Sequence, residues 1–205
     1  MADRVGVIDY GGGNLQNVLN VLKHLNHDGT LVSSPDDFAE IDRLIFPGVG
    51  SFGDCVADLD RKSLRDPILD WLGSDRPFFG ICLGYQVLFE NSEESPGVAG
   101  LGFFGGSVVR FNSLHGLKIP HMGWNEVKPT DRDYHMWAGT HDPLYLYFVH
   151  SFFPKPADES IVNSVTDYGA PFASSVSQGN IFAGQFHPER SQDAGLALVR
   201  NFLEK

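Results

Sequence analysis

The most reactive side chain in the sequence is the thiol of Cys82, which stands between two nearby glycines. Residues 80–84, GICLG, match the G-x-nucleophile-x-G pattern of a nucleophile elbow, a sharp turn from a strand into a helix. Glycines remove side chains that would clash at such a turn, and the N-terminus of the following helix favours a thiolate. Since a pattern with two fixed glycines also arises by chance, a buried structural cysteine is an equal alternative on this stretch alone.

A thiol nucleophile needs a base, and the base needs a group that orients it. The strand-like run IFAGQF (181–186) ends at His187, followed by Pro188 and Glu189. Side chains at a strand end reach the edge of an open α/β sheet, where ligands bind. The spacing lets the carboxylate of Glu189 reach the imidazole and fix its tautomer. Cys82, His187 and Glu189 are therefore the candidate catalytic triad.

The second cysteine and several other histidines lack such a context. Cys55 lies in SFGDCVADLD and is expected to pack in the core. His24 and His27 end a helical run, whereas His115 and His135 lie in loop-like sequence. Exposed or capping roles are expected for these four histidines.

A glycine-rich segment, IFPGVGSFGD (45–54), follows a predicted strand and lacks the lysine and the spacing of a Walker loop. It is either a tight loop or the source of a main-chain N–H for an oxyanion. The N–H of Leu83 points into the space beside the thiol in an elbow. We expect it to hold one side of a developing oxyanion, with the glycine-rich segment on the other side.

The two halves of the chain differ in their predicted elements. The first half alternates strands (4–9, 30–34, 43–48, 77–81) with helical segments (14–27 with Asn14 as N-cap, 52–75, 85–92). The second half consists of strands (106–111, 125–130, 144–152, 161–167, 172–176, 181–186) and a closing helix (193–205). Alternation predicts a parallel sheet with helices on both faces. We predict one α/β domain over residues 1–205, with a central mostly parallel sheet and additional antiparallel strands in the second half.

Composition excludes several classes of protein. The chain has 205 residues and a formal net charge of −11, and no basic stripe is visible, so nucleic-acid binding is not expected. No apolar run approaches the ~20 residues of a membrane span. The first ten residues contain no apolar run preceded by basic residues, so a secretory signal is not expected. Two cysteines indicate a reducing compartment, most simply the cytoplasm.

At this level of detail the motifs resemble a known family. GICLG with Gln86, PGVG (47–50) and QFHPE (185–189) resemble the class I, triad-type glutamine amidotransferases, which have a flavodoxin-like fold. The resemblance runs the full length and narrows to the glutaminase subunits of imidazole glycerol phosphate synthase, from histidine biosynthesis. Four strings carry that narrower resemblance: YGGGNLQNV (10–18), PGVGSFGD (47–54), PHMGWN (120–125) and YFVHSFF (147–153).

The resemblance implies a mechanism for the site. Cys82 would attack the carboxamide of L-glutamine after His187, held by Glu189, takes the thiol proton. The oxyanion would be met by the N–H groups of Leu83 and Val49. The family uses no metal or cofactor. The α-amino and carboxylate groups of glutamine would be held near Gln86 and the main chain at Gly50 and Ser151, with Glu94 as a weaker candidate.

The resemblance also implies a partner, a (β/α)₈-barrel cyclase subunit that receives ammonia through a channel. That subunit converts the precursor PRFAR into imidazole glycerol phosphate and AICAR, and the two subunits form a heterodimer. Trp124, in what reads as a turn, is a candidate interface anchor, although a core position is the alternative. Its candidate neighbours are His121, Met122, Asn14, Tyr147 and Arg190. Alone, the chain is expected to be a poor glutaminase.

Two residues depart from the family pattern, and two other functions compete. The family usually has lysine where this chain has Arg190, and often tyrosine in place of Phe152.

One competing function is a class I glutaminase that serves a different synthase, although the glutaminase of pyridoxal phosphate synthase would carry PGGES in place of PGVGS. The other is a non-catalytic regulatory or redox-sensing domain that keeps the elbow cysteine.

Overall fold

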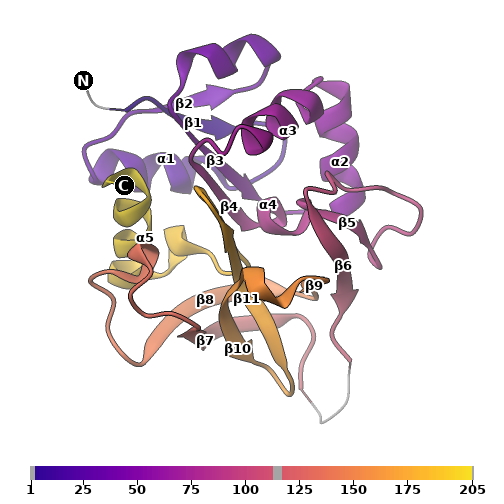
Figure 1. Cartoon of the computed structure of the whole chain (residues 1–205), viewed down its shortest axis with the longest axis vertical. Helices are drawn as coiled ribbons and strands as arrows, with labels where there is room; N and C mark the ends of the chain where they lie inside the picture. Colours follow the sequence, from indigo (N-terminus) through magenta and orange to yellow (C-terminus); the bar gives the residue numbers. More distant parts are fainter. Residues whose placement is uncertain (1–2, 113–116, 205) are drawn as a thin grey trace.

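A nine-stranded mixed sheet forms the centre of the protein (Figure 1). The computed structural model describes residues 3–112 and 117–204. Five neighbouring strands run parallel, in the order β2 (Gly29–Val32), β1 (Val5–Ile8), β3 (Arg43–Gly48), β4 (Phe78–Cys82) and β12 (Ile181–Gly184). Four antiparallel strands continue the sheet: β11 (Pro171–Gln178), β10 (Val162–Asp167), β7 (His121–Pro129) and β8 (Leu144–His150). The predicted α/β class and the change of character between the two halves are confirmed.

Helices cover both faces of the parallel part of the sheet. The core on one face includes side chains of α1 (Leu15–His24) and α5 (Gln192–Glu204). The core on the other face includes side chains of α2 (Phe52–Arg61) and α3 (Arg65–Gly73). Because β1 and β3 are buried along their whole length, they contain continuous apolar residues instead of an alternating pattern. Asn14 occupies the N-cap position of α1, as expected, but its side chain makes no capping hydrogen bond.

A smaller sheet and four short helices complete the described part of the chain. The three-stranded sheet has the order β5 (Phe89–Ser92), β6 (Phe104–Arg110), β9 (Phe152–Pro156). The 3₁₀ turns are η1 (Pro35–Glu40), η3 (His135–Trp137), η4 (Glu159–Ile161) and η5 (Pro188–Arg190). None of the helices between residues 3 and 112 or between 117 and 204 combines the length and apolar character needed to cross a lipid bilayer.

The sheet register brings three strand ends together. Gly48 at the end of β3 lies opposite Cys82 at the end of β4, and Gly184 at the end of β12 lies opposite Ile81. Parallel strands that end at one level form the edge at which ligands bind in open α/β sheets. The elbow, the glycine-rich segment and the His-Pro-Glu segment therefore start from the same edge.

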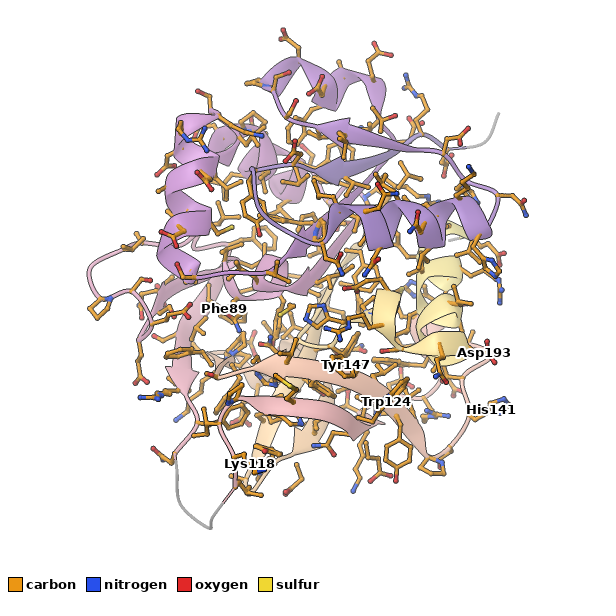
Figure 2. All side chains as sticks on the ribbon, turned by 180° about the vertical axis from the view of Figure 1, so that it is seen from behind. Phe89, Lys118, Trp124, His141, Tyr147 and Asp193 are labelled. Atoms are coloured by element: carbon orange, nitrogen blue, oxygen red, sulfur yellow. The ribbon has the colours of Figure 1, made fainter. Side chains whose placement is uncertain are left out.

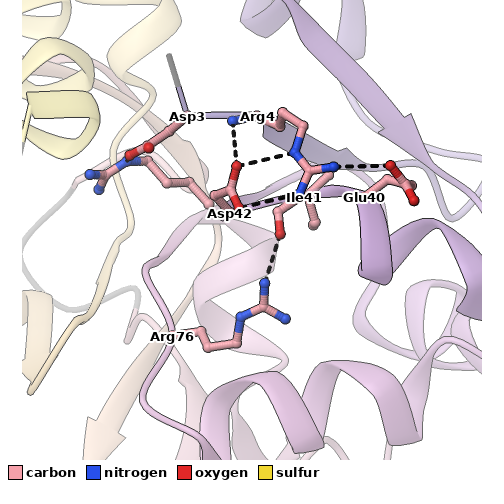
Figure 3. A network of polar contacts seen from close by, with 7 residues as sticks. Asp3, Arg4, Glu40, Ile41, Asp42 and Arg76 are labelled. Atoms are coloured by element: carbon pink, nitrogen blue, oxygen red, sulfur yellow. Dashed lines mark hydrogen bonds and ion pairs between the residues drawn. The ribbon is translucent and has the colours of Figure 1, made fainter. Parts of the chain in front are cut away.

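An ionic network lies at the other end of the parallel strands, where β1 and β3 begin (Figure 3). The main-chain N–H of Arg4 donates to Asp42 Oδ2 at 2.9 Å, and its guanidinium contacts the carboxylates of Asp42 and Glu40. Arg76 donates to the carbonyl oxygen of Ile41 at 2.7 Å. Exposed ion pairs of this kind contribute little to stability, because water screens them. The network fastens the starts of β1 and β3 and lies away from the strand ends that build the site.

The predicted helix over 85–92 is wrong. The helix α4 spans only Leu83–Gln86, and the chain continues directly into β5. Val87, Leu88 and Phe89 are all fully buried, so no polar face exists along which a helix could continue. The carbonyl oxygens of Val87 and Leu88 accept hydrogen bonds from the main chain of residues 101 and 104. Tertiary contacts have replaced the helical hydrogen bonds.

The segment around Trp124 is a strand and not the expected turn. Trp124 lies in β7 and pairs with Tyr147 of β8. Its predecessor Gly123 has a φ of 129°, which a glycine tolerates inside a strand and which makes the sequence look like a turn. His115, for which an exposed or capping role was expected, lies outside the described residues.

Candidate active site

Cys82 stands at a sharp turn between β4 and α4, as the glycine pattern predicts. Its φ and ψ angles are 53° and −103°, a backbone conformation that residues other than glycine rarely adopt. Such a conformation costs about 1–3 kcal/mol and persists only where the surrounding structure enforces it. The side chain is 7% exposed, so the thiol is nearly enclosed. Cys55, by contrast, is 1% exposed and packs in the core between sheet and helices, as expected.

The elbow is built by very close packing of main chain. A Cβ atom on Gly84 would lie 1.9 Å from the carbonyl oxygen of Phe46, a distance that no real contact allows. A Cβ atom on Gly80 would lie 2.8 Å from the carbonyl oxygen of Gly84. The glycines are therefore required because β3, β4 and α4 touch through their backbones, and this contact fixes the position of the thiol.

The imidazole of His187 is held rigidly. Its Nδ1 lies 2.8 Å from Glu189 Oε1, and both side chains are at most 3% exposed. Since a carboxylate accepts hydrogen bonds, the proton of the neutral ring sits on Nδ1 and leaves Nε2 as the basic nitrogen. The main-chain N–H of His187 donates to Tyr147 at 2.8 Å, and Ser191 Oγ donates to its carbonyl oxygen at 2.6 Å.

The pKa of His187 is raised from 6.5 to about 10. Burial is the strongest single influence and would lower it, but the negative charges of the Cys82 sulfur and the Glu189 carboxylate together outweigh burial. Nε2 makes no hydrogen bond within the described part of the chain, so Cys82 acts on it chiefly through charge. His187 thus has a basic nitrogen that can accept the thiol proton and keep it.

One cavity of about 310 Å³ joins the expected site residues. Its lining includes Cys82, both expected oxyanion residues and all four expected substrate residues: Leu83, Val49, Gly50, Gln86, Ser151 and Glu94. A larger cavity of about 780 Å³ lies beside Phe111 and Phe172, and neither Cys82 nor any expected oxyanion or substrate residue lines it. The smaller cavity is therefore the one with the means for chemistry.

The loop that carries Val49 faces solvent and is held by a single hydroxyl. Val49 is 42% exposed, and its main-chain N–H donates to Tyr10 Oη at 3.2 Å. The same hydroxyl donates back to the carbonyl oxygen of Val49 at 3.0 Å. The N–H expected to serve as the second oxyanion donor is therefore occupied by Tyr10 in this conformation.

The expected substrate residues also have structural partners. Gln86 is 4% exposed and donates to the carbonyl oxygen of Phe152 at 2.9 Å, so it is not a solvated helix residue. Glu94 accepts the N–H of Phe52 at 2.8 Å and so caps α2 from within the cavity lining. The carbonyl oxygen of Ser151 accepts from the N–H of Phe111 at 3.1 Å. Side chains that are fixed in this way line the cavity in one conformation.

The sequence analysis missed three residues near the thiol, namely Tyr10, His150 and Gln185. Gln185 is fully buried, and its Nε2 lies 3.5 Å from Cys82 Sγ. His150 lines the cavity, and burial lowers its pKa to about 3. A signal was present for two of them, since Gln185 and His150 are polar residues within otherwise apolar runs, IFAGQF and LYLYFVH.

Trp124 and Tyr147, two of the expected interface residues, lie next to each other on β7 and β8 (Figure 2). Met122 and Trp124 of β7 are 61% and 47% exposed, and Trp124 contacts the ring of Tyr147 edge-on. The guanidinium of Arg190 lies 4.1 Å from the centre of the Tyr147 ring. His121 departs from the expectation, because its side chain is 3% exposed and points into the interior. Asn14 is partly buried before α1.

Metal chemistry has no visible centre here. Within residues 3–112 and 117–204, no group of three or more His, Cys, Asp or Glu side chains is arranged to hold a metal ion.

Fold and site together define a class of protein. The family model "Glutamine amidotransferase class-I" matches residues 6–205, and the chain belongs to this family. The chain in "Structure of PurLQS from Thermotoga maritima" superposes with a TM-score of 0.79 at 20% identity, over 99% of this chain and 98% of that one, which supports the fold.

Within the family, the chain is similar to subunits of one synthase. The chain is 46% identical over 207 residues to "Imidazole glycerol phosphate synthase subunit HisH" of Methylococcus capsulatus, covering 97% of this chain and 95% of the relative. It is 41% identical to "Imidazole glycerol phosphate synthase hisHF, chloroplastic" of Arabidopsis thaliana, covering 97% of this chain and 34% of that longer protein. The family resemblance drawn from the motifs is confirmed.

Proposed function

We propose that this protein is the glutaminase subunit of imidazole glycerol phosphate synthase in histidine biosynthesis. It hydrolyses L-glutamine to glutamate and ammonia and passes the ammonia to a cyclase subunit, which makes imidazole glycerol phosphate and AICAR from PRFAR. The observation that carries the proposal is the arrangement of Cys82, His187 and Glu189, with the thiol opening into a cavity of about 310 Å³. A non-catalytic domain would not need a strained cysteine beside a buried, oriented base.

Catalysis begins with transfer of the Cys82 proton to His187 Nε2. The thiolate then attacks the carboxamide carbon of glutamine, and the negative charge moves to the carboxamide oxygen. His187 donates its proton to the departing ammonia, and water hydrolyses the γ-glutamyl thioester. Because Glu189 holds the Nδ1 proton at 2.8 Å, the imidazolium that forms between these steps is stabilised in place.

The oxyanion requires main-chain donors. Leu83 is the first residue of α4, so its N–H is one of those that the helix does not use. Val49 is the proposed second donor, and Tyr10 must release its N–H first. Loss of one oxyanion donor typically costs about 3–4 kcal/mol, or two to three orders of magnitude in rate. The chain alone is therefore a poor glutaminase until the loop changes its conformation.

A (β/α)₈-barrel cyclase is the proposed trigger for that change and the acceptor of ammonia. Exposed Met122, Trp124 and Arg190, together with the partly buried Tyr147, offer aromatic and cationic anchors of the kind that dominate protein interfaces. The longer plant relative, which bears the name of the synthase as a whole, supports a partner of this kind. The cytoplasm remains the expected compartment, because both cysteines are free thiols.

The decisive experiment is Cys82→Ala in complex with the barrel subunit, with Cys55→Ala as a matched control. Cys82→Ala should abolish glutamine-dependent synthesis and leave ammonia-dependent synthesis intact, whereas Cys55→Ala should leave both. Survival of glutamine-dependent synthesis in Cys82→Ala would remove the proposed nucleophile. Glutaminase rates with and without the barrel subunit and its nucleotide ligand test the partner: equal rates would remove the proposed activation.

A further inference from the structure

A continuous series of buried polar groups leads from β7 to the sulfur of Cys82. Each neighbouring pair lies within hydrogen-bonding distance, and the side chains involved are at most 7% exposed, apart from the partly buried Asn125 at the outer end. In order, the groups are the side chains of Asn125, His121 and His150, the main-chain carbonyl of Phe152, the side chains of Gln86 and Gln185, and Cys82 Sγ.

The direction of every hydrogen bond near the thiol follows from one carbonyl oxygen. The oxygen of Phe152 can only accept, so the amide atom of Gln86 that lies 2.9 Å away must be its nitrogen. That nitrogen lies 3.0 Å from the amide of Gln185, which must therefore present its oxygen to Gln86. The Gln185 nitrogen consequently faces Cys82 Sγ at 3.5 Å. The partners of the Gln185 amide therefore fix its orientation.

The histidines on the outer side agree with this direction. His150 Nδ1 lies 2.8 Å from the carbonyl oxygen of Phe152, so it carries the proton and leaves Nε2 as an acceptor. His121 Nδ1, 2.9 Å from that Nε2, must then be a donor, and its own Nε2 accepts from Asn125. Asn125 is oriented in turn because its Nδ2 donates to the carbonyl oxygen of Asp167 at 2.8 Å. The series is satisfied with both histidines neutral.

We propose that the Gln185 side-chain amide is a further catalytic group, which donates a hydrogen bond to the Cys82 sulfur and stabilises its thiolate. Gln86 acts as a positioning residue, because its amide fixes which end of Gln185 faces the sulfur. The inference rests on the proposed function only in that it gives Cys82 the role of nucleophile.

The short helix after the elbow explains why such a donor is needed. The thiolate was expected to gain from the dipole of a full-length helix, but α4 has only four residues. A single turn aligns few peptide dipoles, so it supplies less positive potential than a longer helix. A hydrogen bond to a charged acceptor is stronger than one to a neutral acceptor. Gln185 can therefore replace what the missing turns would have contributed.

Other titratable groups also face the thiol, and the test must hold them constant. His187 and Tyr10 interact with the Cys82 sulfur through charge, while Glu94 and His150 line the same cavity. A change confined to Gln185 leaves these four groups in place. The difference in the pH dependence of Cys82 alkylation between variant and parent then measures the contribution of the Gln185 amide.

The experiment measures how fast iodoacetamide alkylates Cys82 as a function of pH, by mass spectrometry of the Cys82 peptide in the full chain. Gln185→Met keeps a similar length without N–H groups, and it should raise the pH midpoint by about one unit. Gln185→Glu should raise the midpoint further, because a carboxylate repels the thiolate. Gln86→Met should cause a smaller rise, since it only frees the Gln185 amide to turn.

Thr166→Val is the matched control, because it removes a fully buried hydroxyl that has no hydrogen-bond partner in the described part of the chain. It should leave the midpoint unchanged. An unchanged midpoint in folded Gln185→Met would overturn the proposal, and a lowered one would place the amide oxygen at the sulfur. If Gln185→Met fails to fold, Gln185→Glu provides the test: a raised pH midpoint supports the proposal, and an unchanged midpoint overturns it. The assay uses neither glutamine nor a partner, so an inactive glutaminase with the expected shift would refute the proposed function alone.

Discussion

The two sides of the Cys82 thiol are built in opposite ways. On one side lie the elbow and the His187–Glu189 pair, where backbones touch and side chains are almost fully buried. On the other side lies the loop of Val49 and Gly50, which is exposed and is held by the hydroxyl of Tyr10. The buried side needs no partner to take its shape, whereas a change of a few hydrogen bonds can rearrange the exposed side. The proposed nucleophile thus takes its position within this chain alone, whereas the proposed oxyanion loop is open to control.

Two glycine substitutions should show the largest difference between the two sides, measured as loss in the free energy of unfolding. Gly84→Ala places a methyl group 1.9 Å from the Phe46 oxygen, so the free energy of unfolding should fall by more than about 4 kcal/mol. Gly50→Ala meets no atom within 4 Å and suffers only from the φ of 112°, a strain of about 1–3 kcal/mol. Urea denaturation measures both losses. Equal losses would mean that the two sides are packed alike.

Glu189→Gln should test the orientation of the base. The glutamine amide can donate as well as accept, so it no longer fixes the proton on His187 Nδ1, and it lacks the charge that helps to raise the pKa of His187. We therefore expect kcat to fall by about 10²–10⁴ with little change in KM. The alkaline limb of the pH–rate profile, where His187 loses its proton, should move to lower pH. Exposed Glu159→Gln is the control and should leave both quantities unchanged. A drop in affinity for glutamine without a drop in kcat would contradict the role of Glu189.

Low pH should reduce the free energy of unfolding, because His121 and His150 are buried in their neutral form. Burial lowers the pKa of His121 to about 4 and of His150 to about 3, so the folded protein binds fewer protons than the unfolded chain below pH 6.5. The free energy of unfolding is therefore highest above pH 6.5, where both histidines are neutral in either state. It falls as the pH drops from 6.5 through the folded-state pKa values of the two histidines, by up to about 1.4 kcal/mol per pH unit for each histidine. His150→Leu should therefore flatten the dependence of unfolding free energy on pH, while Thr166→Val should not. An unchanged slope in His150→Leu would show that His150 titrates normally.

Tyr10→Phe should have the smallest effect and should act only on the exposed side. It removes the hydroxyl that holds both the N–H and the carbonyl of Val49, at a net loss of about 1 kcal/mol. The glutaminase rate of the isolated chain should rise about fivefold, because the loop reaches its second conformation more often. Tyr145→Phe, on the exposed surface, is the control. A rate that falls or stays constant in Tyr10→Phe would mean that the hydroxyl does not restrain the loop.

Local patterns predicted most of the candidate site. The triad could be found because an elbow needs glycines at fixed positions and because a His-x-Glu at a strand end reaches the same sheet edge. The error at residues 85–92 had a physical cause, since Val87, Leu88 and Phe89 are buried on all sides and helical spacing cannot be told from a buried strand there. Gln185 and Tyr10 escaped notice because their partners are 103 and 39 residues away.

By itself, the sequence determined most of the elements, the α/β class and the family, and it predicted a nucleophile and its base. These properties depend on short-range spacing, which sets periodicity, turns and the chemistry of a motif. Only the tertiary structure decided which way the Gln185 amide points, that the N–H of Val49 is occupied, and that His121 is buried while Trp124 is exposed. The reason is that a hydrogen bond's direction, and a side chain's exposure, depend on atoms brought together from distant parts of the chain.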